Sequence, residues 1–123
     1  MNGHAHILIG SHVNFKFDIS QEALLAAAKA AWIHTRFAVP WLATRTVKAE
    51  ESNSWSIVYE APNRSDDDHM TQWANETVLW RVGLRSAAAW EDTIKQEYWR
   101  PDDGRYSMEY HIARAPAGGF FFM

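Results

Sequence analysis

The chain of 123 residues has no cysteine, no linker rich in proline, glycine or serine, and no long apolar run. Without cysteine it has neither a disulfide framework nor a cysteine-ligated zinc site, and it suits a reducing compartment. Its apolar runs are far shorter than a membrane span, and the first residues lack the basic and apolar regions of a signal peptide. With a net charge of −3 and no basic cluster, we expect no nucleic acid or membrane partner and a cytoplasmic location.

What the chain does have is aromatic side chains: seven Trp, six Phe and four Tyr. Each ring buries a large area, so even a short chain of this composition can form a core. The apolar share of 47% and the charged share of 22% are typical of a globular domain. We therefore expect a single domain over residues 1–123.

The first half of the chain alternates between strand and helix patterns. His12 to Asp18 alternates apolar and polar residues, which predicts a half-buried strand. Residues 20–37 have helical spacing with Leu24, Ala28 and Trp32 on the face toward the sheet, and Pro40 ends this helix. Two short strands follow, at residues 44–49 and 54–59, with a turn at 50–53.

The second half begins with a helix from Ser65, whose first turn carries Asp66, Asp67 and Asp68 beside the positive end of the helix dipole. Its apolar stripe is Met70, Trp73, Thr77, Trp80 and Leu84. A further helix is predicted at 87–99, a turn at 101–104, a strand at 106–113, a turn at 115–119 and a last strand at 120–123. The order predicts an α+β fold with a mixed or antiparallel sheet and two or three helices packed on it.

The last strand, Phe120–Met123, is apolar at every position, which is typical of a strand covered on both faces. We expect it to pair with the strand at 106–113 along one edge. An uncovered apolar strand would invite association along its edge. We therefore expect a second chain or a second copy to cover its other edge and its faces.

No motif of a metal or nucleotide enzyme occurs. His4 and His6 have the spacing of ligands on one strand face, and His12 is the nearest third ligand, but a closed site needs three or four. We expect no metal. A Gly-x-Ser-x-Gly elbow, a Walker loop and a dinucleotide glycine fingerprint are all missing from the sequence.

Three residues are the candidates for contact with a small-molecule substrate. Trp41 follows Pro40 in a loop context, whereas Trp32, Trp73, Trp80 and Trp90 lie at helical spacing and are expected in the core. Tyr59 ends a strand just before a turn. His111 is the third candidate, as an acid–base or hydrogen-bonding side chain; His34 and Glu76 are weaker ones.

Three stretches together resemble a known family. One is His12-Val-Asn-Phe-Lys-Phe-Asp18; the next is the helix end Ala-Ala-Trp32-Ile-His-Thr-Arg36-Phe-Ala-Val-Pro40-Trp-Leu-Ala43; the last is Tyr59-Glu-Ala-Pro62 followed by an acidic helix start and Trp73-Ala-Asn-Glu-Thr77. They are similar to the N-terminal region of fungal condensation-domain-like acyltransferases, including the trichothecene acetyltransferase type. The resemblance covers nearly all of the chain, and its motifs are structural.

The resemblance implies part of one lobe of a chloramphenicol-acetyltransferase-like fold, in which two lobes enclose a tunnel. An acyl-CoA and an acceptor hydroxyl or amine enter that tunnel from opposite ends, and Trp41 and Tyr59 would face it. The family's general base is the histidine of a His-x-x-x-Asp motif. No histidine of this chain has an aspartate four places on. No catalytic residue is therefore assigned, and we expect the chain to bind no cofactor alone and to lack acyl transfer by itself.

The sequence thus favours an incomplete N-terminal portion of an acyltransferase-like enzyme of fungal secondary metabolism. Two alternatives remain open. One is a stand-alone binding or assembly protein on the same scaffold, dimeric through its last strand. The other is a small cyclase or isomerase that holds an apolar metabolite in an aromatic cavity.

Overall fold

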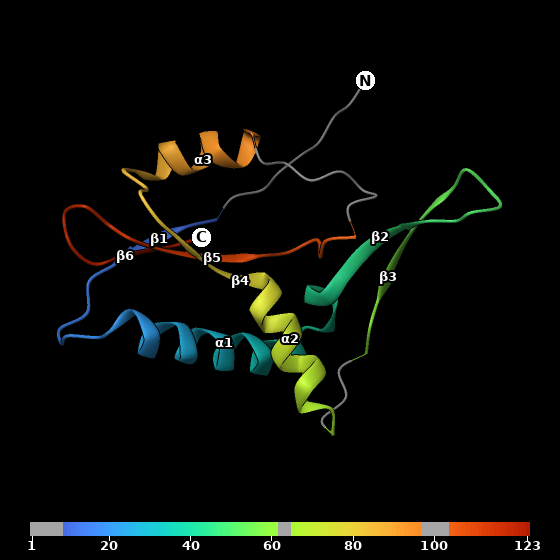
Figure 1. Ribbon diagram of the computed structural model, residues 1–123, viewed down its shortest axis with the longest axis horizontal. Coiled ribbons are helices and arrows are strands. Elements are labelled where there is room, and N and C mark those ends of the chain that lie inside the picture. Colours follow the sequence, from blue (N-terminus) through green and yellow to red (C-terminus); the bar gives the residue numbers. More distant parts are fainter. Residues whose placement is uncertain (1–8, 62–64, 97–103) are drawn as a thin grey trace.

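The computed structural model describes residues 9–61, 65–96 and 104–123, which form three layers with a hairpin to one side (Figure 1). The helices are α1 (Gln21–Ala38), α2 (Asp67–Thr77) and α3 (Ala87–Gln96), with a short 3-10 helix, η1 (Pro40–Ala43). The strands are β1 (Ser11–Val13), β2 (Thr44–Lys48), β3 (Trp55–Tyr59), β4 (Val78–Arg81), β5 (Tyr110–Arg114) and β6 (Phe120–Phe122).

The main sheet has the order β1-β6-β5-β4, with β4 and β5 parallel and the other neighbours antiparallel. Figure 1 shows α1 and α2 on one face of this sheet and α3 on the other. The hairpin of β2 and β3 forms a separate two-stranded sheet. The predicted mixed α+β class, with helices packed on a mixed sheet, is confirmed.

Helix α1 agrees with its predicted bounds to within one residue. Ser20 caps it, because the Ser20 hydroxyl accepts a hydrogen bond from the Ala23 backbone N–H at 3.1 Å. Leu24 is buried against Val78, Ile112 and Phe120, and Ala28 and Trp32 pack against the same cluster. The predicted sheet-facing stripe is confirmed.

Strand β6 is covered on both faces, as its composition predicts. Phe120 and Phe122 lie toward α1, whereas Phe121 and Met123 pack with Trp90 and its neighbours beneath α3. It also pairs with β5 as predicted. The prediction that another chain pairs with its second edge is wrong for this edge, because β1 of the same chain pairs there, with Val13 opposite Phe120.

The first strand is shorter than the predicted stretch from His12 to Asp18. Pairing ends at Val13 because β6 begins at Phe120, directly after the turn that joins it to β5. Gly119 in that turn has φ +74°, and a Cβ there would lie 2.5 Å from the Val13 carbonyl oxygen. Only glycine fits so close an approach. Beyond the pairing, Phe17 is exposed.

The second helix ends much earlier than its predicted stripe. Helix α2 stops at Thr77, and Trp80 belongs to strand β4 rather than to the helix; Leu84 lies beyond it, beneath α3. Val78–Arg81 pairs in parallel with β5, so a partner distant in sequence overrides the helical spacing. The observed order therefore has an additional strand between α2 and α3.

The remaining elements agree with expectation where the structure describes them. Strands β2 and β3 form the predicted hairpin, and α3 covers the first part of the predicted helix at 87–99. The strand predicted at 106–113 is regular only from Tyr110, with an isolated bridge between Tyr106 and Arg45. His4, His6, residues 97–99 and most of the turn at 101–104 lie outside the described residues.

Within the described ranges, no helix is long and apolar enough to cross a membrane.

Candidate functional site

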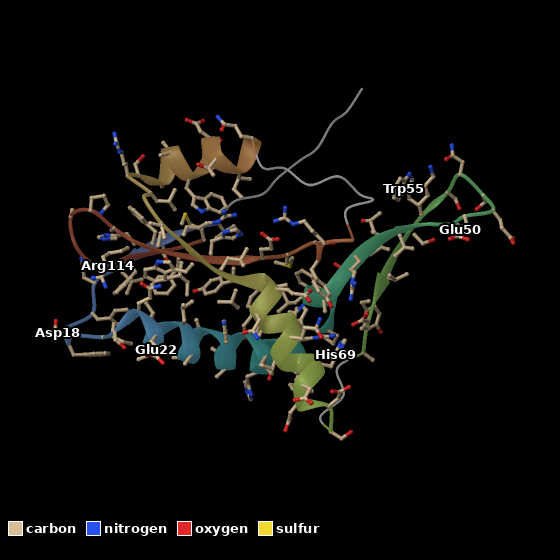
Figure 2. All side chains as sticks on the ribbon, in the orientation of Figure 1. Asp18, Glu22, Glu50, Trp55, His69 and Arg114 are labelled. Atoms are coloured by element: carbon tan, nitrogen blue, oxygen red, sulfur yellow. The ribbon has the colours of Figure 1, made fainter. Side chains whose placement is uncertain are left out.

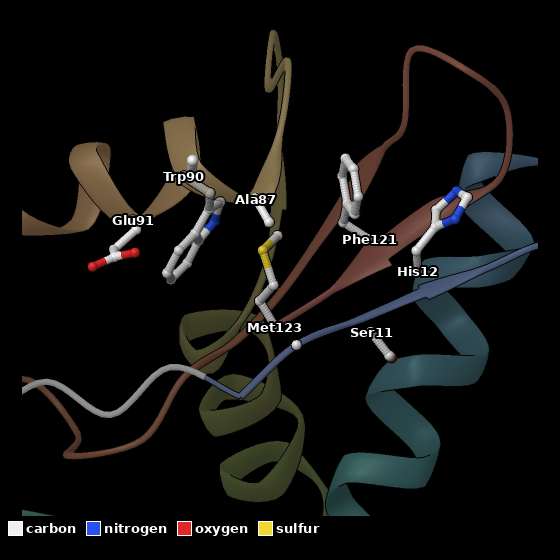
Figure 3. A pocket seen from close by; sticks show the side chains of 9 residues that line it. Ser11, His12, Ala87, Trp90, Glu91, Phe121 and Met123 are labelled. Atoms are coloured by element: carbon white, nitrogen blue, oxygen red, sulfur yellow. The ribbon is translucent and has the colours of Figure 1, made fainter.

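A pocket of about 410 Å³ lies between α3 and the edge of the main sheet formed by β1 and β6 (Figure 3). Its lining is Gly10, Ser11, His12, Ala87, Ala88, Trp90, Glu91, Phe121 and Met123. Figure 3 shows the side chains of His12, Phe121 and Met123 rising from the sheet toward α3, from which Trp90 descends. The walls are therefore largely apolar and aromatic.

The side chain of His12 lies in this lining and makes a hydrogen bond through its ring. Its Nε2 lies 2.8 Å from the carbonyl oxygen of Gly118. A carbonyl oxygen only accepts hydrogen bonds, so Nε2 carries the proton and donates the hydrogen bond. In the neutral ring, Nδ1 is then a hydrogen-bond acceptor. The ring of Phe121, at a centroid distance of 5.3 Å, supports the imidazole from the side. An imidazole and an apolar wall thus lie side by side in the lining of the pocket.

The charge of the pocket follows from the same lining. Among the residues that the structure describes, Glu91 is the one charged side chain of the lining, which includes neither Lys nor Arg. Such a site suits an apolar molecule with a hydroxyl or amine that donates a hydrogen bond. It does not suit the phosphates of coenzyme A, which need cations or clustered backbone N–H donors.

A buried polar network lies behind Trp90, on the inner side of the pocket. The rings of Trp90 and His111 form a T-shaped pair, with their centroids 4.9 Å apart and an angle of 81° between the ring planes. The Arg81 Nε–H donates to His111 Nδ1 at 2.9 Å, so His111 Nε2 carries the proton and donates to Glu109 at 2.9 Å. The other oxygen of Glu109 accepts from Arg105 Nη2 at 2.6 Å.

This network holds Glu109 in its charged form. Burial by itself would raise the pKa of Glu109, but the hydrogen bonds from His111 and Arg105 outweigh burial, and the net result is a lowered pKa. Both nitrogens of His111 are occupied and its side chain is only 3% exposed. His111 therefore orders the interior of the sheet and has no free nitrogen to offer a substrate in this conformation.

A second pocket, of about 360 Å³, lies on the other side of this network. Glu76, Thr77, Leu79, Gly104, Arg105, Tyr106 and Glu109 line it. Burial raises the pKa of Tyr106, although the nearby Arg45 opposes that shift. Its carboxylates and its arginine make it polar, but no pair of a nucleophile and a free base is formed among its described residues.

The three candidate substrate contacts from the sequence do not meet in one place. Trp41 lies in η1 and is 59% exposed, Tyr59 ends β3 and is 60% exposed, and His111 is buried. None of the three lines either pocket described above. Their assignment as substrate contacts stays a prediction.

Sequence reasoning did not find the pocket, although part of the network was visible. Glu109 and His111 alternate on one face of the predicted strand at 106–113, so their proximity follows from strand geometry. The partner Arg81 was hidden because its strand was read as helix. The sequence pattern places His12 at the start of a strand and offers it as a third metal ligand, but not as a pocket residue. In the described part of the chain, no group of three or more His, Asp or Glu residues could hold a metal.

Searches of protein-family models, of curated protein sequences and of solved structures found no match to this chain.

Proposed function

We propose that this chain is the N-terminal, acceptor-holding portion of a condensation-domain-like acyltransferase of fungal secondary metabolism, acting in the cytoplasm. The observation that carries the proposal is that the second and third of the stretches behind the family resemblance contact each other around buried Arg36 and Trp73. Arg36 of the first helix donates from Nη2 to the backbone carbonyl of Glu60 at 2.9 Å. The Arg36 guanidinium also lies 4.7 Å from the centre of the Trp73 ring.

Two further contacts complete this cluster. Trp32 stacks on Trp73 at 5.8 Å with an angle of 4° between the rings, and the Trp32 indole N–H donates to the Thr77 hydroxyl at 3.1 Å. Thus the helix end contacts both Glu60 and the Trp-Ala-Asn-Glu-Thr stretch. These contacts join residues that are distant in sequence, which supports reading them as one structural signature.

The pocket beneath α3 supports the part of the proposal that concerns the acceptor. Its apolar walls and the imidazole of His12 in its lining suit an apolar alcohol or amine. In acyl transfer, the acceptor oxygen or nitrogen bonds to the thioester carbon, its proton passes to a general base, and the thiol of coenzyme A leaves. We propose that the acyl-CoA and the His-x-x-x-Asp base are bound and supplied by polypeptide other than these 123 residues.

The decisive experiment measures the native protein and the 123-residue chain side by side. We expect the native protein, alone or with a co-purifying chain, to carry a His-x-x-x-Asp sequence and to release thiol from acetyl-CoA with an alcohol or amine acceptor. The 123-residue chain should release none above background. A native species of 14.1 kDa without any such partner, or turnover by the short chain alone, overturns the proposal.

Acceptor binding has its own readout in the methyl group of Met123, since the chain has only four methionines. With ¹³C-methyl methionine, an aromatic alcohol or amine should shift the Met123 signal and leave that of buried Met70 unchanged. Ala87→Phe, which narrows the pocket, should abolish the shift, whereas Ala27→Phe on the exposed face of α1 should not. Shifts that survive Ala87→Phe would place the binding elsewhere.

A further inference from the structure

Strand β3 has an outer edge that pairs with no described strand, and its residues are exposed and uncharged. All five residues of Trp55–Tyr59 are exposed, and none of them is charged. The strand pairs only with β2, and no described strand lies on its other side. Figure 1 shows this hairpin projecting from the three-layer body, and Figure 2 shows Trp55 near its far end.

The backbone pattern shows which residues face the open edge. The Ala49 N–H donates to the Ser54 carbonyl at 3.0 Å, so Ala49 and Ser54 form a hydrogen-bonded pair. Such pairs alternate along an antiparallel ladder, which makes Val47–Ser56 and Arg45–Val58 the next ones. The backbone N–H and C=O groups of Trp55, Ile57 and Tyr59 therefore point away from β2, toward the open edge.

The same three residues place their side chains on one face of the strand, because alternate residues share a face. They are 45%, 77% and 60% exposed, in chain order. An exposed, uncharged apolar edge of this kind is a template for pairing with another strand. A two-stranded hairpin is also marginal by itself, whereas four strands make an independently stable sheet.

Three positions of β3 are symmetric in type about Ile57, because an aromatic residue lies two places before it (Trp55) and two places after it (Tyr59), although Ser56 and Val58 differ. An antiparallel pairing centred there sets Ile57 opposite Ile57 of the second copy and Trp55 opposite Tyr59 of the second copy. Aromatic and β-branched pairs of this kind stabilise a sheet. In this register Glu60 meets Ser54 of the second copy, so no like charges are brought together.

We propose that two copies of this chain associate through β3, forming a continuous antiparallel sheet with the order β2-β3-β3-β2 about a two-fold axis at Ile57. The outward backbone groups and the residues symmetric in type are the same three positions, so one register satisfies both. This interface is distinct from β6, whose two edges are paired within the chain. It is independent of the proposed acyl transfer.

The first test is sedimentation of the full chain at micromolar to tens of micromolar concentration. We expect a species of twice the chain mass of 14.1 kDa. Ile57→Lys sets two like charges against each other at the axis and should weaken association by at least about 100-fold. Thr46→Lys is the matched control, because Thr46 is the cross-strand neighbour of Ile57 on β2, away from the open edge; it should remain dimeric.

A charge swap then tests the register. Ile57→Lys and Ile57→Glu should each be monomeric, and an equimolar mixture of the two should dimerise again. Any of three results would overturn the proposal: the wild-type chain is a monomer, the Ile57→Lys variant is still a dimer, or the two folded variants fail to dimerise when mixed. A monomer would mean that a different polypeptide, if any, covers this edge.

Because the chain has no cysteine, a single introduced cysteine reports the axis directly. Paired residues at the axis have Cα atoms about 5.5 Å apart, within the range for a disulfide. Ile57→Cys should cross-link under mild oxidation. Trp55→Cys, on the same strand and face, should not, because two copies of that position would lie about 14 Å apart along the strands. Equal cross-linking of both overturns the register.

Discussion

Strands β6 and β3 are both short, apolar and free of charge, yet the chain buries one and exposes the other. Phe120 of β6 is 6% exposed, whereas Ile57 of β3 is 77% exposed. β6 lies between β1 and β5 and is covered by α1 on one face and α3 on the other. Among the described strands, β3 pairs with β2 alone, and the hairpin extends away from the helices.

The difference teaches that the composition of a strand indicates a need for cover but not where the cover comes from. For β6 the need is met by helices that follow other strands in the sequence. For β3 it is met, within the described residues, by β2 alone.

The largest difference is expected between two tryptophans. Trp73→Ala should cost about 3–5 kcal/mol of the free energy of unfolding, because Trp73 is 1% exposed and packs against Trp32, Arg36 and Tyr106. Trp55→Ala in the hairpin should cost no more than about 1 kcal/mol. Urea unfolding of both variants measures this, and equal costs would mean that the hairpin is as tightly packed as the body.

The buried network should make the body sensitive to acid. Since the pKa of Glu109 is lowered by folding, its charged form stabilises the fold above its unfolded pKa of about 4.3. That stabilisation is lost as the pH falls through the still lower folded pKa. Glu109→Gln should lower stability at neutral pH by about 1–3 kcal/mol and flatten the acid limb of the Tm profile.

Glu76→Gln is the control for this experiment, since Glu76 is an exposed carboxylate on α2. It should leave both the neutral stability and the acid limb nearly unchanged. If Glu109→Gln keeps the acid limb of the wild type, another carboxylate controls it.

A smaller effect is expected where α1 meets α2. The Thr77 hydroxyl accepts from the Trp32 indole and donates to the Trp73 carbonyl at 2.7 Å. Thr77→Val keeps the shape but leaves the indole N–H without its partner, which should cost about 1–2 kcal/mol. Thr71→Val, at an exposed position of the same helix, should cost far less; calorimetry compares the two.

The smallest effect lies within β3 itself. At concentrations too low for association, the amide protons of Trp55, Ile57 and Tyr59 should exchange with solvent faster than those of Ser56 and Val58, which bond to β2. Residue-resolved hydrogen exchange measures this alternation. Raising the concentration should protect the first three. Uniform exchange along β3 at low concentration would contradict the assigned backbone pattern.

Much of the fold was readable from local patterns. Helix α1 followed from its helical spacing and from Pro40, and the β2–β3 hairpin from its alternation and turn. The strand β4 was not readable, because Trp80 continues the helical spacing of Met70, Trp73 and Thr77. Its parallel pairing with β5 spans about thirty residues of sequence, and such a contact is energetically decided by burial rather than by local propensity.

The candidate site was less accessible to sequence reasoning. The alternation of Glu109 and His111 predicts that these two side chains are close. The contacts of Arg81 with His111 and of Arg105 with Glu109 depend on the tertiary structure. The pocket beside His12 is formed by the start of the described chain, by α3 and by β6. Because these segments are distant in sequence, no local sequence pattern predicts the pocket. Trp41, predicted in a loop, lies in the 3-10 helix η1, whereas Tyr59 ends β3 as predicted. Their role as substrate contacts stays a prediction.

The sequence by itself determined which segments need burial and which caps and turns bound them, since those depend on a side chain and its near neighbours. It determined that the last strand, with phenylalanines pointing both ways, needed cover on both faces. Only the tertiary structure decided that β1 takes the second edge of that strand and that no described strand pairs with the outer edge of β3. Strand edges are assigned by competition among all strands for backbone hydrogen bonds, and that competition depends on segments that are remote from one another along the chain.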